Sequence, residues 1–127
     1  MIIIADIEKT IYSALHAAFP TTRVATKKAP ADAQPSEQIV LTVAYGNEKS
    51  VSPVLRYAGV VVDIYADGYD RASTLALQTA AVLQTVTGSS IKKVSITSGP
   101  VRMGSDTGQE HRAISAEVVV KATNYTP

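Results

Sequence analysis

The clearest hydrophobic pattern lies in residues 54–86, where an alternating segment runs directly into a segment with helical spacing. In the first half, Val60, Val62 and Ile64 fall on one side of an extended chain, and such residues favour a pleated strand. Between the halves lie turn residues, and Asp70 is expected to cap the following helix. The second half predicts an amphipathic helix that folds back on the strand and buries one face: Ala72, Leu75, Ala76, Thr79, Ala80 and Leu83.

The rest of the pattern predicts the order helix, strands, helix, strands. Phe19-Pro20 ends the first helix, residues 88–90 should close the second, and polar segments with proline or glycine separate the strands. The expected bounds are helix 6–18, strand 22–26, loop 27–37, strand 39–45, loop 46–53, strand 91–97, a long hairpin connection 98–110, strand 114–122 and a tail 124–127. We therefore expect one α+β domain over residues 1–127, with an antiparallel (mixed) β-sheet of about four to five strands and two α-helices packed on one face.

The face of the sheet away from the helices is less polar than a solvated face should be. If the helices cover Val62 and Val118, the other face presents a mixture of apolar, tyrosine and charged side chains: Tyr57, Val61, Tyr65, Val119, Asp63, Glu117 and Lys121. Tyrosine is favoured where a partly wet surface becomes an interface. Two interpretations stay open: a partner covers this face, or the chain's own loops cover it.

Composition narrows the class of protein. The 127 residues are 46% hydrophobic and 18% charged, which is typical of a folded domain, and the net charge of +1 gives no large basic field. The absence of cysteine excludes disulfides and thiolate chemistry. The opening Met-Ile-Ile-Ile is too short for a signal peptide, and no apolar run reaches membrane-spanning length. We expect a soluble protein made inside the cell.

Candidate catalytic and binding residues do not form a motif. His16 and His111 have no second ligand at metal spacing, and a triad of Asp106, His111 and a serine would lack the strand, elbow and helix that hold a nucleophile. Asp67 and Asp70 have the spacing for a cation, but capping explains them without a ligand. Residues 104–108 lack the lysine of a phosphate-binding loop, and the lysine pairs at 27–28 and 92–93 lack interleaved aromatics. We therefore expect no enzyme, cofactor or metal.

Several segments taken together resemble the tail terminator (tail completion) proteins of long-tailed, siphophage-type bacteriophages. They are the first helix, PSEQIVL at 35–41, VVVDIYA at 60–66, the helix stripe of residues 72–83, and a closing hairpin at Gly99-Pro100 followed by His111-Arg112 and a strand. The likeness covers residues 6–123. The chain departs from the pattern at residues 46–48, where a glycine pair is common, and at Asp67-Gly68, where a serine is common.

The resemblance implies a structural virion protein, made in the host cytoplasm and found in the neck of the tail. Such proteins form a hexameric ring on the head-proximal end of the tail tube, stop the tube protein from polymerising and join the tail to the head–tail connector. Genomic DNA would pass through the lumen without sequence-specific binding. A ring needs a heterologous interface between copies. Candidate interface residues lie on the sheet face and in the two long loops: Tyr57, Val61, Tyr65, Asn47, Glu48, Arg102, Met103, Asp106, His111 and Arg112.

Other classes of function remain alternatives. Another neck or head–tail connector subunit would use the same ring logic, and binding to the portal in place of the tube would distinguish it. A small intracellular ligand-binding α+β domain would need a concave pocket with converging polar groups. A nucleic-acid-binding domain would need a basic face, which the net charge of +1 disfavours.

Overall fold

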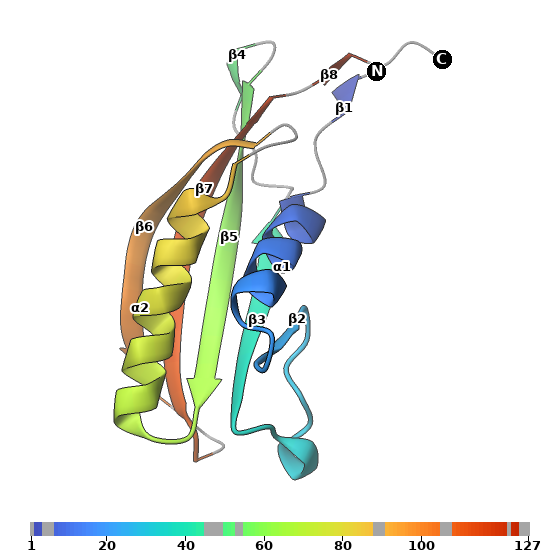
Figure 1. Ribbon diagram of the computed structural model, residues 1–127. Helices are drawn as coiled ribbons and strands as arrows, with labels where there is room; N and C mark the ends of the chain where they lie inside the picture. Colours follow the sequence, from blue (N-terminus) through green and yellow to red (C-terminus); the bar gives the residue numbers. More distant parts are fainter. Residues whose placement is uncertain are drawn as a thin grey trace.

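The computed structural model describes residues 2–3, 7–44, 50–52, 55–87, 91–104, 108–121 and 123–124. Two helices lie side by side on one face of a sheet of long strands (Figure 1). In chain order the elements are β1 (Ile2–Ile3), α1 (Ile7–Ala18), β2 (Arg23–Ala25), the 3-10 helix η1 (Ala31–Ala33), β3 (Glu37–Ala44), β4 (Ser50–Ser52), β5 (Leu55–Ala66), α2 (Tyr69–Thr85), β6 (Ile91–Met103), β7 (Glu110–Lys121) and β8 (Thr123–Asn124). The predicted α+β class is confirmed.

The main sheet has five strands in the order β2-β3-β5-β7-β6, and β4 adds a short sixth strand on β5. The sheet is mixed because β2 runs parallel to β3, while the other pairs are antiparallel. The central strand β5 pairs with β7 along its whole length, from Leu55 opposite Lys121 to Ala66 opposite Glu110. Because the two strands are antiparallel, the end of β5 lies beside the start of β7.

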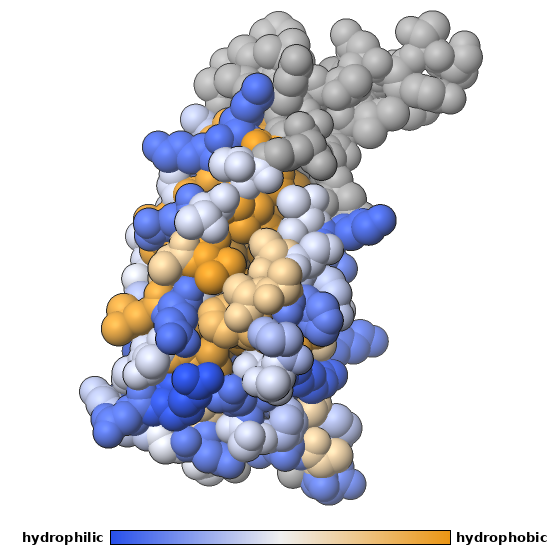
Figure 2. All heavy atoms as spheres, viewed as in Figure 1, coloured by the Kyte–Doolittle hydropathy of each residue, from blue (hydrophilic) through white to orange (hydrophobic). Residues whose placement is uncertain are grey.

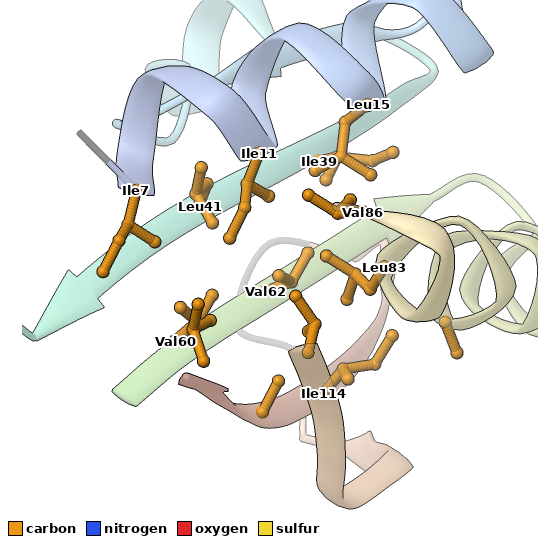
Figure 3. Close-up of a cluster of buried hydrophobic side chains, with 14 of the residues drawn as sticks. Ile7, Ile11, Leu15, Ile39, Leu41, Val60, Val62, Leu83, Val86 and Ile114 are labelled. Atoms are coloured by element: carbon orange, nitrogen blue, oxygen red, sulfur yellow. The ribbon is translucent and has the colours of Figure 1, made fainter. Parts of the chain in front are cut away.

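Both helices bury the stripe that their sequence predicts. Ile7, Ile11 and Leu15 project from α1 onto the apolar side chains of β3 and β5, and Leu83 joins them from α2 (Figure 3). The buried residues of α2 are those expected from the helical spacing. Strand alternation is confirmed as well, because Val60, Val62, Ile64, Ile114, Ala116, Val118 and Val120 all lie in this core. Ala72, Ala76 and Ala80 let the helix backbone approach the sheet closely.

The capping prediction for α2 is wrong. The N-cap position is Gly68, with φ of +93°, and no side chain caps the helix. A positive φ is a conformation that glycine adopts without a steric penalty, so the turn after β5 uses it at this position. Asp70 lies inside the first turn, where its carboxylate faces the positive end of the helix dipole. The helix ends at Thr85, earlier than residues 88–90, which lie outside the described residues.

The predicted long hairpin connection at residues 98–110 is also wrong. Strand β6 continues to Met103 and β7 begins at Glu110, so residues 98–103 of that segment belong to a strand and the connection is shorter than predicted. The Gly99-Pro100 sequence, which indicates a turn, is accommodated by register shifts within the strand. Because β6 lies at the edge of the sheet, the missing N–H of Pro100 removes no bond from an inner ladder.

Three other predicted loops hold more structure than expected. Residues 46–53 include β4, and the predicted tail begins at Asn124, the last residue of β8, which pairs with β1. Residues 27–37 contain η1 and end in β3, and Ala29 within them is buried. Short elements like these gain their stability from a neighbouring strand or a packed surface, which hydrophobic periodicity does not reveal. None of the described helices is long and apolar enough to cross a membrane.

Candidate interaction surfaces

The face of the sheet away from the helices is part covered and part open. In the β5–β7 ladder, Tyr57, Val61 and Tyr65 lie opposite Val119, Ser115 and His111 on this face. Val61 is 40% exposed, and Met103, opposite His111 at the end of β6, is exposed as well. Tyr57 and Tyr65 are half-buried. The predicted apolar and tyrosine character of this face is therefore confirmed.

The segment between β2 and β3 covers one part of this face. The Ala29 amide donates to Gln38 Oε1 at 3.0 Å, and Arg23 Nη1 donates to the same oxygen at 3.0 Å. Lys28 Nζ lies 4.4 Å from the centroid of the Tyr65 ring, a cation–π contact. Lys28 is therefore half-buried against an aromatic ring. In this part of the sheet face, a loop of the same chain covers the apolar and tyrosine side chains.

A carboxylate, an imidazole and a phenol meet beside that loop. His111 Nε2 lies 2.7 Å from Asp63 Oδ1, and the His111 ring stacks on Tyr65 with centroids 4.3 Å apart and planes 18° apart. Asp63 retains 26% and His111 15% of side-chain exposure. The partner of His111 is thus a carboxylate 48 residues away, and no serine hydroxyl in the described ranges contacts the imidazole. These contacts join β5 and β7 through side chains on this face of the sheet.

The uncovered part of the face contains a hollow of about 330 Å³. The residues that line it come from β3, β5, β6 and β7 and include Ala44, Tyr57, Gly59, Val61, Thr97, Ser115 and Glu117. A Cβ atom added to Gly59 would meet only the Ala44 Cβ, at 3.9 Å, so the space above this glycine is open. We call the surface formed by Ala44, Tyr57, Gly59, Val61, Thr97, Ser115 and Glu117 the sheet hollow.

A second surface lies on the helix side, between α2 and the edge strand β6. Tyr69 and Leu77 are 57% and 64% exposed, and with Ser73 they form one stripe of α2. Pro100, Arg102 and Arg112 complete a groove of about 280 Å³. We call the surface of Tyr69, Ser73, Leu77, Pro100, Arg102 and Arg112 the helix-edge groove. Along the α2 edge, Figure 2 shows apolar atoms protruding among polar ones.

Charges are concentrated in the helix-edge groove. Arg102 donates to both carboxylate oxygens of Glu110, at 3.0 and 3.2 Å, and Arg112 Nη1 donates to Oε1 at 3.3 Å. Both guanidinium groups lie over the Tyr69 ring, about 5 Å from its centroid. The hydrogen bonds from Arg102, more than those from Arg112, lower the pKa of Glu110, and the same contacts raise the pKa of Arg102. Two cations and one carboxylate leave the groove with excess positive charge.

The structure places the predicted interface residues unequally. Tyr57 and Val61 line the sheet hollow, Arg102 lines the helix-edge groove, and Met103 lies beside the β6–β7 turn. Arg112 is 4% exposed: it donates to Ser73 Oγ and lies against the Tyr69 ring at the base of the helix-edge groove. Asn47, Glu48 and Asp106 lie outside the described residues.

Sequence reasoning missed Tyr69 and Leu77. Leu77 is a large apolar residue outside the buried stripe of α2. An apolar residue on the polar side of an amphipathic helix can indicate an interaction surface, and this position could have been recognised from the sequence. Within the described residues, no group of three side chains from His, Cys, Asp and Glu is placed to hold a metal ion. No protein-family model matches this chain, and no curated protein matches it either.

Proposed function

We propose that this protein is a tail terminator, a structural subunit that forms a ring on the head-proximal end of a phage tail tube. One observation carries the proposal: helices close only one face of the sheet, and the molecule keeps two unlike uncovered surfaces, the sheet hollow and the helix-edge groove. A ring built by rotation needs such a pair, because each copy must present one patch to the preceding copy and a different patch to the next.

The placement of β4 and of the adjoining ends of β6 and β7 supports the same function. Strand β4 lies beside the beginning of β5, where Ser50 is opposite Arg56. The β6–β7 turn lies at the other end of β5, where Ala66 is opposite Glu110. The long central strand thus separates two contact segments, as Figure 1 shows for β4 and the end of β6. A subunit between two layers, tube and connector, needs a contact segment toward each.

Tail tubes polymerised from the tube protein of the same phage would test this function directly. We expect the purified protein to appear by negative-stain imaging as a ring at one end of each tube, after which the tubes stop lengthening. Free tube ends that continue to grow in excess protein would overturn the proposal. A ring that binds isolated portal assemblies and ignores tubes would assign the chain to the connector side of the neck.

A pair of point variants would connect the tube contact to the β6–β7 end of the molecule. Met103→Asp places a charge on an exposed apolar side chain beside the turn and should abolish capping. The matched control, Tyr12→Ser, changes an exposed aromatic residue on α1 and should cap normally. Circular dichroism should show both variants folded. Normal capping by Met103→Asp would show that this end does not contact the tube.

A further inference from the structure

The helix-edge groove has a protruding leucine side chain and more positive than negative charge. Leu77 extends from α2 with 64% of its surface exposed, the largest exposed fraction among the large hydrophobic side chains that the structure describes. Next to it, Arg102 and Arg112 share the single carboxylate of Glu110. A surface that fits against this groove should therefore provide an apolar recess and a carboxylate.

The sheet hollow provides both. Gly59 and Ser115 leave room in its floor, and Val61 adds an exposed apolar wall. Glu117 lies at its rim, half-buried, and forms no hydrogen bond or ion pair with the described part of the chain. A half-buried carboxylate without a partner is stabilised by an arriving cation, and an arginine is suited to this because its planar fork can bind both oxygens.

We propose that the sheet hollow of one copy receives Leu77 and Arg102 of a second copy, with Arg102 facing Glu117. The two surfaces lie on opposite faces of the sheet, so one copy can use both at once. Because the surfaces differ, the contact is heterologous and repeats from copy to copy until it closes. This contact would be the subunit interface of the proposed ring, so the inference rests on the proposed function.

Disulfide cross-linking tests the contact in a chain that contains no cysteine. Leu77→Cys and Val61→Cys are made as separate variants, and both positions are exposed, so both variants should fold. We expect a cross-linked dimer when the two variants are mixed and air-oxidised, and none with either variant alone. Cross-linking of Leu77→Cys to itself would show a symmetric helix contact, and no cross-link in the mixture would show that these surfaces do not meet. Either result overturns the proposal.

Charge reversal tests the pairing of Arg102 with Glu117. Arg102→Glu alone and Glu117→Arg alone should each abolish self-association in sedimentation velocity, because like charges then meet at every contact. An equimolar mixture should associate again, since alternating copies restore opposite charges at both kinds of contact. Lys92→Glu makes the same charge change elsewhere on β6 and should leave association unchanged. Wild-type protein that stays monomeric at millimolar concentration, or a mixture that does not associate, would contradict the pairing.

Gly59→Val fills the hollow while preserving the strand. The added Cβ meets only Ala44, and valine favours a strand, so the variant should fold at least as stably as the wild type and yet lose self-association. Association by this folded variant would show that the hollow is not the contact. Two results separate this contact from the proposed function. If Gly59→Val caps tubes, the contact is rejected and the proposed function stands. If wild-type surfaces cross-link but the protein never caps tubes, the contact stands and the proposed function is rejected.

Discussion

At the scale of single residues, the ends of strands are joined by a few polar contacts. Arg71 Nε and Nη2 donate to the two carboxylate oxygens of Glu37 at 2.6 and 3.0 Å, and Thr22 Oγ1 donates to Oε1 at 2.8 Å. Gln109 donates to the Pro35 carbonyl at 2.7 Å. These contacts connect α2, β3 and the β6–β7 turn at the end of the molecule that is mainly polar in Figure 2.

Glu37 should make stability depend on pH. The hydrogen bonds from Arg71, and less those from Thr22, outweigh partial burial and lower the pKa of Glu37 below its ordinary value of 4.5. Since the folded state has the lower pKa, the stabilisation is complete above about pH 4.5 and is lost as the pH falls further. Glu37→Gln should therefore reduce the free energy of unfolding by about 1 kcal/mol at pH 7 and by less at pH 3.

Urea denaturation at both pH values measures this difference. Asp32→Asn is the matched control, because it removes an exposed carboxylate on η1 and should change little at either pH. An equal loss of stability at pH 3 and pH 7 in Glu37→Gln would indicate that the charge of Glu37 is not what stabilises the fold.

Gly99 should tolerate no side chain. Its φ is +99°, and an added Cβ would lie 2.4 Å from the Ala113 carbonyl oxygen and 3.2 Å from the Ile114 Cα. Because both neighbours are backbone atoms of β7, neither can move aside easily. We expect Gly99→Ala to lower the free energy of unfolding by at least about 2 kcal/mol. Gly104→Ala, which meets no atom within 4 Å, should cost little. Similar denaturation midpoints for the two variants would contradict this account.

At the scale of the elements, α2 has two functions on two faces. Its buried stripe holds the sheet, and the stripe of Tyr69, Ser73 and Leu77 forms the wall of the helix-edge groove. One helix therefore contains a leucine that stabilises the fold and a leucine that does not. The same substitution at the two positions should separate stability from association.

Leu83→Ala should leave a cavity beneath α2, because Leu83 is fully buried among the core side chains. We expect a loss of about 2–5 kcal/mol in the free energy of unfolding. Leu77→Ala should change stability by less than about 0.5 kcal/mol, since the side chain is mostly in solvent. Self-association, measured by sedimentation velocity, should show the opposite ranking of the two variants. Leu77→Ala should lose self-association at a concentration where the wild type associates. A large stability loss in Leu77→Ala would contradict its assignment to an interface.

At the scale of the whole molecule, the sheet separates two surfaces of opposite character. The helix-edge groove has excess positive charge and a protruding apolar side chain. The sheet hollow has open space and a carboxylate, that of Glu117, which pairs with no residue in the described ranges. The β6 edge beside the groove is long, and its register shifts and exposed Lys92 and Lys93 discourage direct strand pairing with another chain. Association should therefore proceed through side chains of two faces and not through an extended sheet.

The elements with a strong local period were predictable from the sequence. The stripes of α1 and α2 and the alternation of β5 and β7 follow from which positions are apolar, and burial in the structure agrees with them. The open apolar sheet face was predictable for the same reason. Local patterning determines which side of an element is buried, and it acts over only a few residues.

Tertiary structure decided what depends on neighbours. Strand β6 passes through Gly99-Pro100 because it lies at an edge, where the pairing is free to shift. His111 meets Asp63, and Arg112 lies beneath Tyr69, because the register of β5 and β7 and the position of α2 bring distant segments together. Such contacts depend on which strands pair and in which register, and a one-residue shift would exchange the two faces. The sequence by itself thus determined the faces of the main elements, and only the tertiary structure decided which residues share a surface.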